Sequence, residues 1–147
     1  DLLFAGKSYN LDTLTVGETE DPTVSRMTIE MTMDDVTFEQ VKKQLNRNVV
    51  VIKVMDFSDI PIQKTELLYI KIHSCTEKDK TEIFRIVNSF DHLDIADYGK
   101  KSVIVRYVET EGKVNDIIEL FNKTFINRIE VVRGGSVAIE SVSTTTK

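Results

Sequence analysis

The chain has 147 residues, with 24 acidic and 19 basic side chains, a net charge of -5, two histidines, one cysteine and no tryptophan. This length suits one ordinary domain or two very small ones. With 41% hydrophobic and 29% charged residues, the composition predicts a packed core and excludes a disordered chain. The acidic balance argues against nucleic acid and anionic membranes as partners. A lone Cys75 and the lack of a membrane-spanning run favour a cytoplasmic protein.

The charge is shared unevenly between two halves of the chain. Residues 1–60 hold 11 acidic and 6 basic side chains, an excess of five negative charges, whereas the remaining residues hold 13 of each. Pro61 lies at the boundary, where it has no N–H to donate and disfavours a helical Ile60. We therefore predict a linker at 61–65, an N-terminal domain at 1–60 and a C-terminal domain at 66–147.

The second half contains six predicted elements, assigned from alternation, helical spacing and turn residues. They are a strand at 66–75, a helix from the cap at Thr76 to about Ser89, strands at 93–98 and 102–108 joined by a turn at Gly99, a helix from 110 to 125, and a strand at 128–139 interrupted by Gly134 and Gly135. The order is strand, helix, strand, strand, helix, strand.

The first half repeats most of this order. The predicted elements are a helix end near Gly6, strands at 11–19 and 26–32, a helix capped by Asp34 or Asp35 that carries Phe38, Val41 and Leu45, and a strand at 49–57. Only an opening strand is missing, so we infer an internal duplication whose first strand lies upstream of Asp1. The predicted fold is α+β: two tandem ferredoxin-like βαββαβ domains, the first lacking its N-terminal strand. Domains this small favour self-association into at least a dimer.

Motifs for catalysis are missing from the sequence. No Gly-x-Ser-x-Gly elbow occurs, and His73 and His92 are the only candidate bases for a triad. His92 lies near Asp91 and Asp94, but a turn before a strand explains these residues better than a metal site does. We expect no catalytic residues, no metal ligands and no cofactor in this chain, and a bulge or turn at Gly134 and Gly135 rather than a phosphate loop.

Two adjoining stretches carry a family resemblance. Residues 9–17 (YNLDTLTVG) and 19–29 (TEDPTVSRMTI) resemble the signature of the small regulatory subunits of acetolactate synthase. The similarity continues through 39–45 (EQVKKQL) and 51–54 (VIKV), and more weakly through 66–71, 82–84 and 131–133. It therefore covers almost the whole chain.

The resemblance implies an N-terminal ACT domain and a C-terminal ACT-like domain, both ferredoxin-like, with dimerisation through the ACT domains. It implies a regulatory role, in which the small subunit binds the catalytic subunit, raises its activity and confers feedback inhibition by valine in branched-chain amino acid biosynthesis. Thiamine diphosphate, a divalent metal and FAD would belong to the catalytic subunit.

The resemblance also suggests functional positions. Asn10 and Leu11 take the effector role, with the Asn10 amide for the polar groups of valine and Leu11 for its isopropyl group. Thr15, Gly17 and Gln40 match positions for communication with the catalytic subunit. Because the family's main valine-binding loop would lie upstream of Asp1, we expect this chain alone to bind valine weakly or not at all. Two alternatives remain: an ACT-type amino-acid sensor serving another metabolic enzyme or transcriptional regulator, and a free-standing enzyme on the same scaffold.

Overall fold

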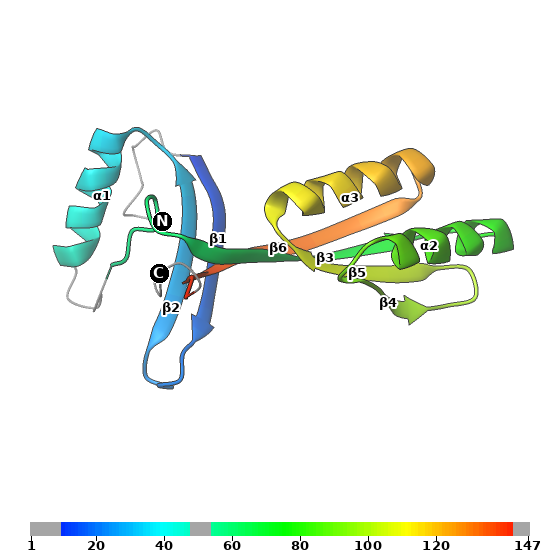
Figure 1. Cartoon of the computed structure of the whole chain (residues 1–147), viewed down its shortest axis with the longest axis horizontal. Coiled ribbons are helices and arrows are strands. Elements are labelled where there is room, and N and C mark those ends of the chain that lie inside the picture. Colours follow the sequence, from blue (N-terminus) through cyan, green and yellow to red (C-terminus); the bar gives the residue numbers. More distant parts are fainter. Residues whose placement is uncertain (1–9, 48–53, 143–147) are drawn as a thin grey trace. The chain divides into compact units, whose positions relative to one another are not determined.

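A computed structural model describes residues 10–47 and 54–142 (Figure 1). The chain forms two compact units. Among the described residues, the first unit comprises 10–47, 54–63 and 138–142, and the second comprises 64–137. The two sheets confirm a mixed α+β fold.

The first unit contains a hairpin and a helix. Strands β1 (Asn10–Glu18) and β2 (Ser25–Thr32) pair antiparallel. Asp21 shapes the turn between them, since its carboxylate accepts from the backbone N–H of Thr23 at 3.0 Å. Helix α1 (Asp35–Arg47) follows. Its cap is Asp34, whose carboxylate accepts from the N–H of Thr37 at 2.7 Å.

The second unit is a complete βαββαβ domain. Its elements are β3 (Ile62–Ile72), whose first two residues belong to the first unit, α2 (Glu77–Ser89), β4 (Leu93–Tyr98), β5 (Val103–Glu109), α3 (Glu111–Thr124) and β6 (Ile129–Glu140), whose last three residues belong to the first unit. The strands lie in the order β4-β5-β3-β6, which is the ferredoxin-like arrangement. The predicted capping box forms, because Thr76 and Asp79 exchange side-chain to backbone hydrogen bonds of 2.9 and 3.1 Å.

Both helices of this unit pack on one face of the sheet. Alternate residues of β3 and β5, including Leu68, Ile70 and Val105, are buried against Ile83 of α2 and Phe121 of α3. The 3.6-residue period places one apolar stripe of each helix against the strands. The opposite face of the sheet carries exposed Leu67, Tyr69 and Val108 among charged side chains.

Strand β6 changes its inward register at the two glycines. Before them, Ile129 packs against the core and Arg133 bonds to the buried Glu66 at 3.0 Å. After them, Ser136 and Ala138 are buried, so the inward positions shift from odd to even numbers. The strand continues through the pair, and this shift of one position is what a bulge produces.

The structure differs from the sequence-based elements at two places. Residues 62–65, expected to be a linker, are strand, because β3 pairs with β6 and the N–H of Ser141 donates to the carbonyl of Pro61 at 2.9 Å. The predicted strand 49–57 is wrong at its described end. Residues 54–57 are not strand, because Asp56 accepts from the N–H of Ser58 at 2.9 Å and turns the chain. Residues 48–53 and the predicted helix end near Gly6 lie outside the described residues.

Candidate functional site

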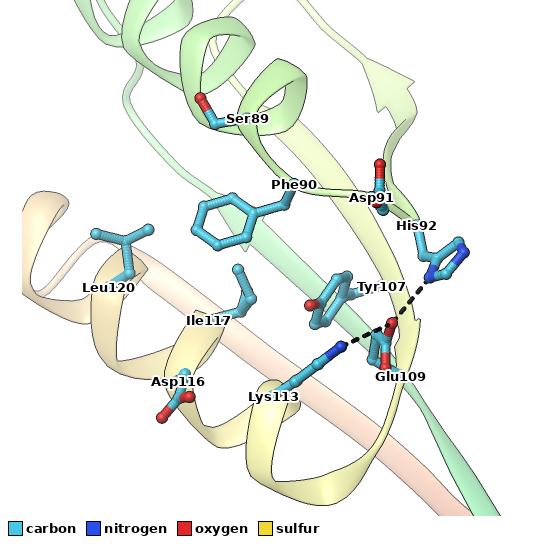
Figure 2. Close-up of a pocket in the computed structure, with 10 residues that line it drawn as sticks. All are labelled: Ser89, Phe90, Asp91, His92, Tyr107, Glu109, Lys113, Asp116, Ile117 and Leu120. Atoms are coloured by element: carbon cyan, nitrogen blue, oxygen red, sulfur yellow. Dashed lines mark hydrogen bonds and ion pairs between the residues drawn. The ribbon is translucent and has the colours of Figure 1, made fainter. Parts of the chain in front are cut away.

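A hollow of about 390 Å³ opens between the two helices of the second unit (Figure 2). It is lined by the end of α2, the residues that enter β4, the end of β5 and the first turns of α3. The lining residues are Ser89, Phe90, Asp91, His92, Tyr107, Glu109, Lys113, Asp116, Ile117 and Leu120. A volume of this size is within the range of small-molecule sites.

The sheet register explains why these residues meet. Leu93 of β4 lies opposite Tyr107 of β5, so the residue before Leu93 reaches the end of β5. That residue, His92, has a φ of 67°, a left-handed conformation that histidine adopts more readily than most residues. Helix α3 begins two residues after Glu109, which brings Lys113 to the same carboxylate.

Glu109 is the electrostatic centre of the hollow. Its side chain is 13% exposed, and its Oε1 lies 2.8 Å from Nδ1 of His92 and 3.7 Å from Nζ of Lys113. Its Oε2 accepts from the N–H of Thr110 at 3.0 Å. Because a carboxylate only accepts, Nδ1 of His92 carries the proton in this contact. The hydrogen bond from His92, then that from Thr110, then the charge of Lys113 hold the pKa of Glu109 below its ordinary value.

Apolar side chains form the other wall. Figure 2 shows Phe90, Ile117 and Leu120 on the side of the hollow away from His92 and Glu109. Tyr107 lies between the two groups and is only 3% exposed. Burial raises the pKa of Tyr107, and the nearby charges of Glu109, Asp116 and Asp91 raise it further. The hollow thus combines an apolar wall with a negative field at the phenol.

The residues suggested as effector and communication positions lie in the first unit. Asn10, Leu11, Thr15 and Gly17 all belong to β1, where they pair with Thr32, Met31, Thr28 and Arg26 of β2. Gln40 lies exposed on α1. Strand alternation places Thr15 and Gly17 on one face of the hairpin.

Sequence reasoning did not identify the hollow. It considered His92 together with Asp91 and Asp94, whereas the structure pairs His92 with Glu109 and places Asp94 at 3.9 Å from Arg106. Two features of the sequence could have indicated the hollow. Tyr107 lies in the inward register of a predicted strand, and Glu109 and Lys113 follow it four residues apart. Within residues 10–47 and 54–142, no three His, Cys, Asp or Glu side chains converge to hold a metal ion. None of the helices described in the structure is long and apolar enough to cross a membrane.

Comparisons with known proteins cover both halves of the chain. A family model described as the small subunit of acetolactate synthase matches residues 65–142, and a model of the AHAS small subunit-like ACT domain matches residues 2–53. The acetolactate synthase small subunit of Aquifex aeolicus is 38% identical over 137 residues, which are 93% of this chain and 70% of that protein. The chain belongs to the acetolactate synthase small-subunit family.

Other members of the acetolactate synthase small-subunit family agree with this assignment. The acetolactate synthase isozyme 3 small subunit of Escherichia coli is 32% identical over 142 residues, covering 93% of this chain and 82% of that protein. The crystal structure of the acetolactate synthase small subunit from Thermotoga maritima superposes with a TM-score of 0.83 at 32% identity. That comparison covers 97% of this chain and 87% of the other. Membership supports a regulatory-subunit role in branched-chain amino acid biosynthesis and implies a catalytic subunit as partner.

Proposed function

We propose that this chain activates the catalytic subunit of acetolactate synthase and makes it sensitive to feedback inhibition by valine. The observation that carries the proposal is the match of two small-subunit family models, one to each half of the chain. In this proposal the reaction takes place on the catalytic subunit, with its thiamine diphosphate, divalent metal and FAD. The small subunit contributes binding energy and no reacting group.

An exposed apolar face of the first unit supports dimerisation through this domain. Leu14, Val16 and Met27 are 50%, 61% and 56% exposed, and the register places Val16 opposite Met27 and Leu14 opposite Ile29 on one face of the hairpin. Grouped exposed apolar side chains indicate a surface that a partner covers. A second copy of this ACT domain is the partner that the family membership favours.

Gly17 supports a contact surface for the catalytic subunit. A Cβ added at Gly17 would meet nothing within 4 Å, so packing within the described chain does not require a glycine there. A glycine within a strand often marks the close approach of another backbone. Together with Thr15 on the same face and Gln40 on α1, it would form the communication surface.

Valine would bind at Asn10 and Leu11, where β1 begins. The Asn10 amide offers both a donor and an acceptor for the valine ammonium and carboxylate groups, and Leu11 offers apolar contact. Feedback then requires only that valine binds one arrangement of the two subunits better than the other.

The test is acetolactate formation by the catalytic subunit, measured with and without this chain and with increasing valine. We expect activation by the chain, inhibition by valine only when the chain is present, and no product from the chain alone. Asn10→Ala should weaken valine inhibition and leave activation unchanged, with Asn46→Ala on α1 as a matched control. Activation of an unrelated amino-acid-regulated enzyme instead, or no effect on the catalytic subunit, would contradict the proposal.

A further inference from the structure

A tyrosine hydroxyl at the base of the hollow has no hydrogen-bond partner among the described residues. Tyr107 is 3% exposed, and the structure gives its hydroxyl no hydrogen-bond partner among the described residues. Figure 2 shows this hydroxyl directed into the hollow, toward the side on which Ile117 lies. Because the Tyr107 side chain is buried while its hydroxyl faces the hollow, a molecule in the hollow can supply the hydrogen-bond partner that the described residues do not.

The charged side chains around the hollow indicate that a bound ligand would carry a positive charge. Asp91, Glu109 and Asp116 are negative, and only Lys113 and, when protonated, His92 oppose them. Glu109 already pairs with both, whereas Asp91 and Asp116 make no ion pair within the described residues. The negative field acts at the Tyr107 hydroxyl, whose pKa is raised by burial and then by these three carboxylates. A cationic group near the phenol oxygen would be stabilised by this field.

The apolar wall indicates that the remainder of the ligand would be apolar. Phe90, Ile117 and Leu120 line the hollow opposite Glu109, and they would cover an aliphatic or aromatic body. The face of Phe90 or Tyr107 would also attract an ammonium group through its ring electrons. A metal ion would gain nothing from these walls.

We propose that this hollow binds a small organic ammonium ion with an apolar body, held by the Tyr107 hydroxyl within the negative field of Asp91, Glu109 and Asp116. An α-amino acid with an apolar side chain is a common compound of this class, and its carboxylate would then lie toward Lys113. The site is separate from the effector position proposed at Asn10 and Leu11, which belongs to the first unit.

Three related probes test the proposal on the full chain in phosphate buffer. Isoamylamine has the ammonium and the apolar body, L-leucine adds a carboxylate, and 4-methylpentanoate has the carboxylate without the ammonium. Binding is followed by ¹H–¹⁵N NMR shifts, which assign each event to one unit. We expect isoamylamine and L-leucine to shift the amides of Phe90, His92 and Lys113, with dissociation constants of about 1 mM or tighter.

Tyr107→Phe removes only the hydroxyl without a partner, so the fold should persist. We expect it to weaken isoamylamine binding by about tenfold or more, since a hydrogen bond to a charged group is lost. Tyr69→Phe, on the helix-free face of the same sheet, is the matched control and should leave binding unchanged. Three results would each overturn the proposal. The first is shifts with 4-methylpentanoate as large as those with isoamylamine, and the second is equal isoamylamine affinity in Tyr107→Phe. The third is no shift in the second unit at 20 mM isoamylamine, roughly twentyfold above the expected dissociation constant. Because no catalytic subunit is present, failure here leaves the regulatory function standing.

Discussion

Replacing each of the two adjacent glycines of β6 by alanine should have very different effects on stability. Gly135 has a φ of +122°, and a Cβ there would lie 3.1 Å from Cα of Glu66 and 3.2 Å from the carbonyl oxygen of Thr65. Both atoms are backbone of β3, which is hydrogen-bonded into the middle of the sheet and cannot easily move aside. A Cβ at Gly134 would meet nothing within 4 Å.

The magnitude follows from two costs and one gain. An L side chain in this backbone region costs about 1–3 kcal/mol, and overpacking against fixed atoms costs about 1–3 kcal/mol more. Because alanine lowers the conformational entropy of the unfolded chain relative to glycine, the replacement also stabilises the fold by about 0.4–1 kcal/mol. We therefore expect Gly135→Ala to lower the free energy of unfolding by about 1–6 kcal/mol. Gly134→Ala should be neutral or stabilising by up to about 1 kcal/mol.

Urea unfolding of the two variants provides the assay. The signal should come from the second unit, which holds Tyr69, Tyr98 and Tyr107, so near-ultraviolet circular dichroism reports on the relevant domain. The m-value should stay constant if only stability changes. Equal midpoints for Gly134→Ala and Gly135→Ala would refute the reasoning, because backbone strain and the close approach to β3 distinguish the two positions.

Three further predictions follow from the described contacts. Phe121→Ala should lower the free energy of unfolding by about 3–5 kcal/mol, because Phe121 is fully buried against Phe125; in the same urea assay, Phe84→Ala at an exposed position should cost much less. His92→Ala removes the hydrogen bond to Glu109 and should raise the pKa of Glu109 toward its ordinary value, measured by NMR titration of its side-chain carbon, with His73→Ala as control. A carboxyl whose pKa is lowered by folding stabilises the chain above its unfolded pKa of about 4.3, and that contribution is lost as the pH falls toward the folded pKa. His92→Ala should therefore lose less stability than the parent between neutral pH and about pH 3. Gly17→Ala should keep the unfolding midpoint of the parent but impair activation of the catalytic subunit; an unchanged activation would argue against contact at Gly17.

Local signals allowed most of the second unit to be predicted. The capping box at Thr76 and Asp79 and the turn after Tyr98 depend on residues a few positions apart, so their patterns are visible in the sequence. The start of β3 at Ile62 was not predictable in this way. Its extension depends on pairing with β6, whose residues lie far along the chain.

The hollow could not be predicted because its parts come from four segments. His92 meets Glu109 only after β4 and β5 pair in register, and the apolar wall forms only when α3 packs on the sheet. Sequence neighbours pointed instead to Asp94, which alternation turns to the other face. The positions suggested in β1 came from the family resemblance, and their roles remain predictions.

Because of the register change in β6, the number of residues between its two halves decides which side chains face the core. Deleting Gly134 would join the halves without the extra residue and restore simple alternation, so either Ile129 and Arg133 or Ser136 and Ala138 would have to turn outward. If the later half turned, Val137 and Ile139 would enter the space that now holds Ser136 and Ala138, two much smaller side chains. If the earlier half turned, Glu66 would lose Arg133 and keep a buried carboxylate without its cation. A one-residue deletion in this strand is therefore expected to destabilise the domain whichever half turns outward.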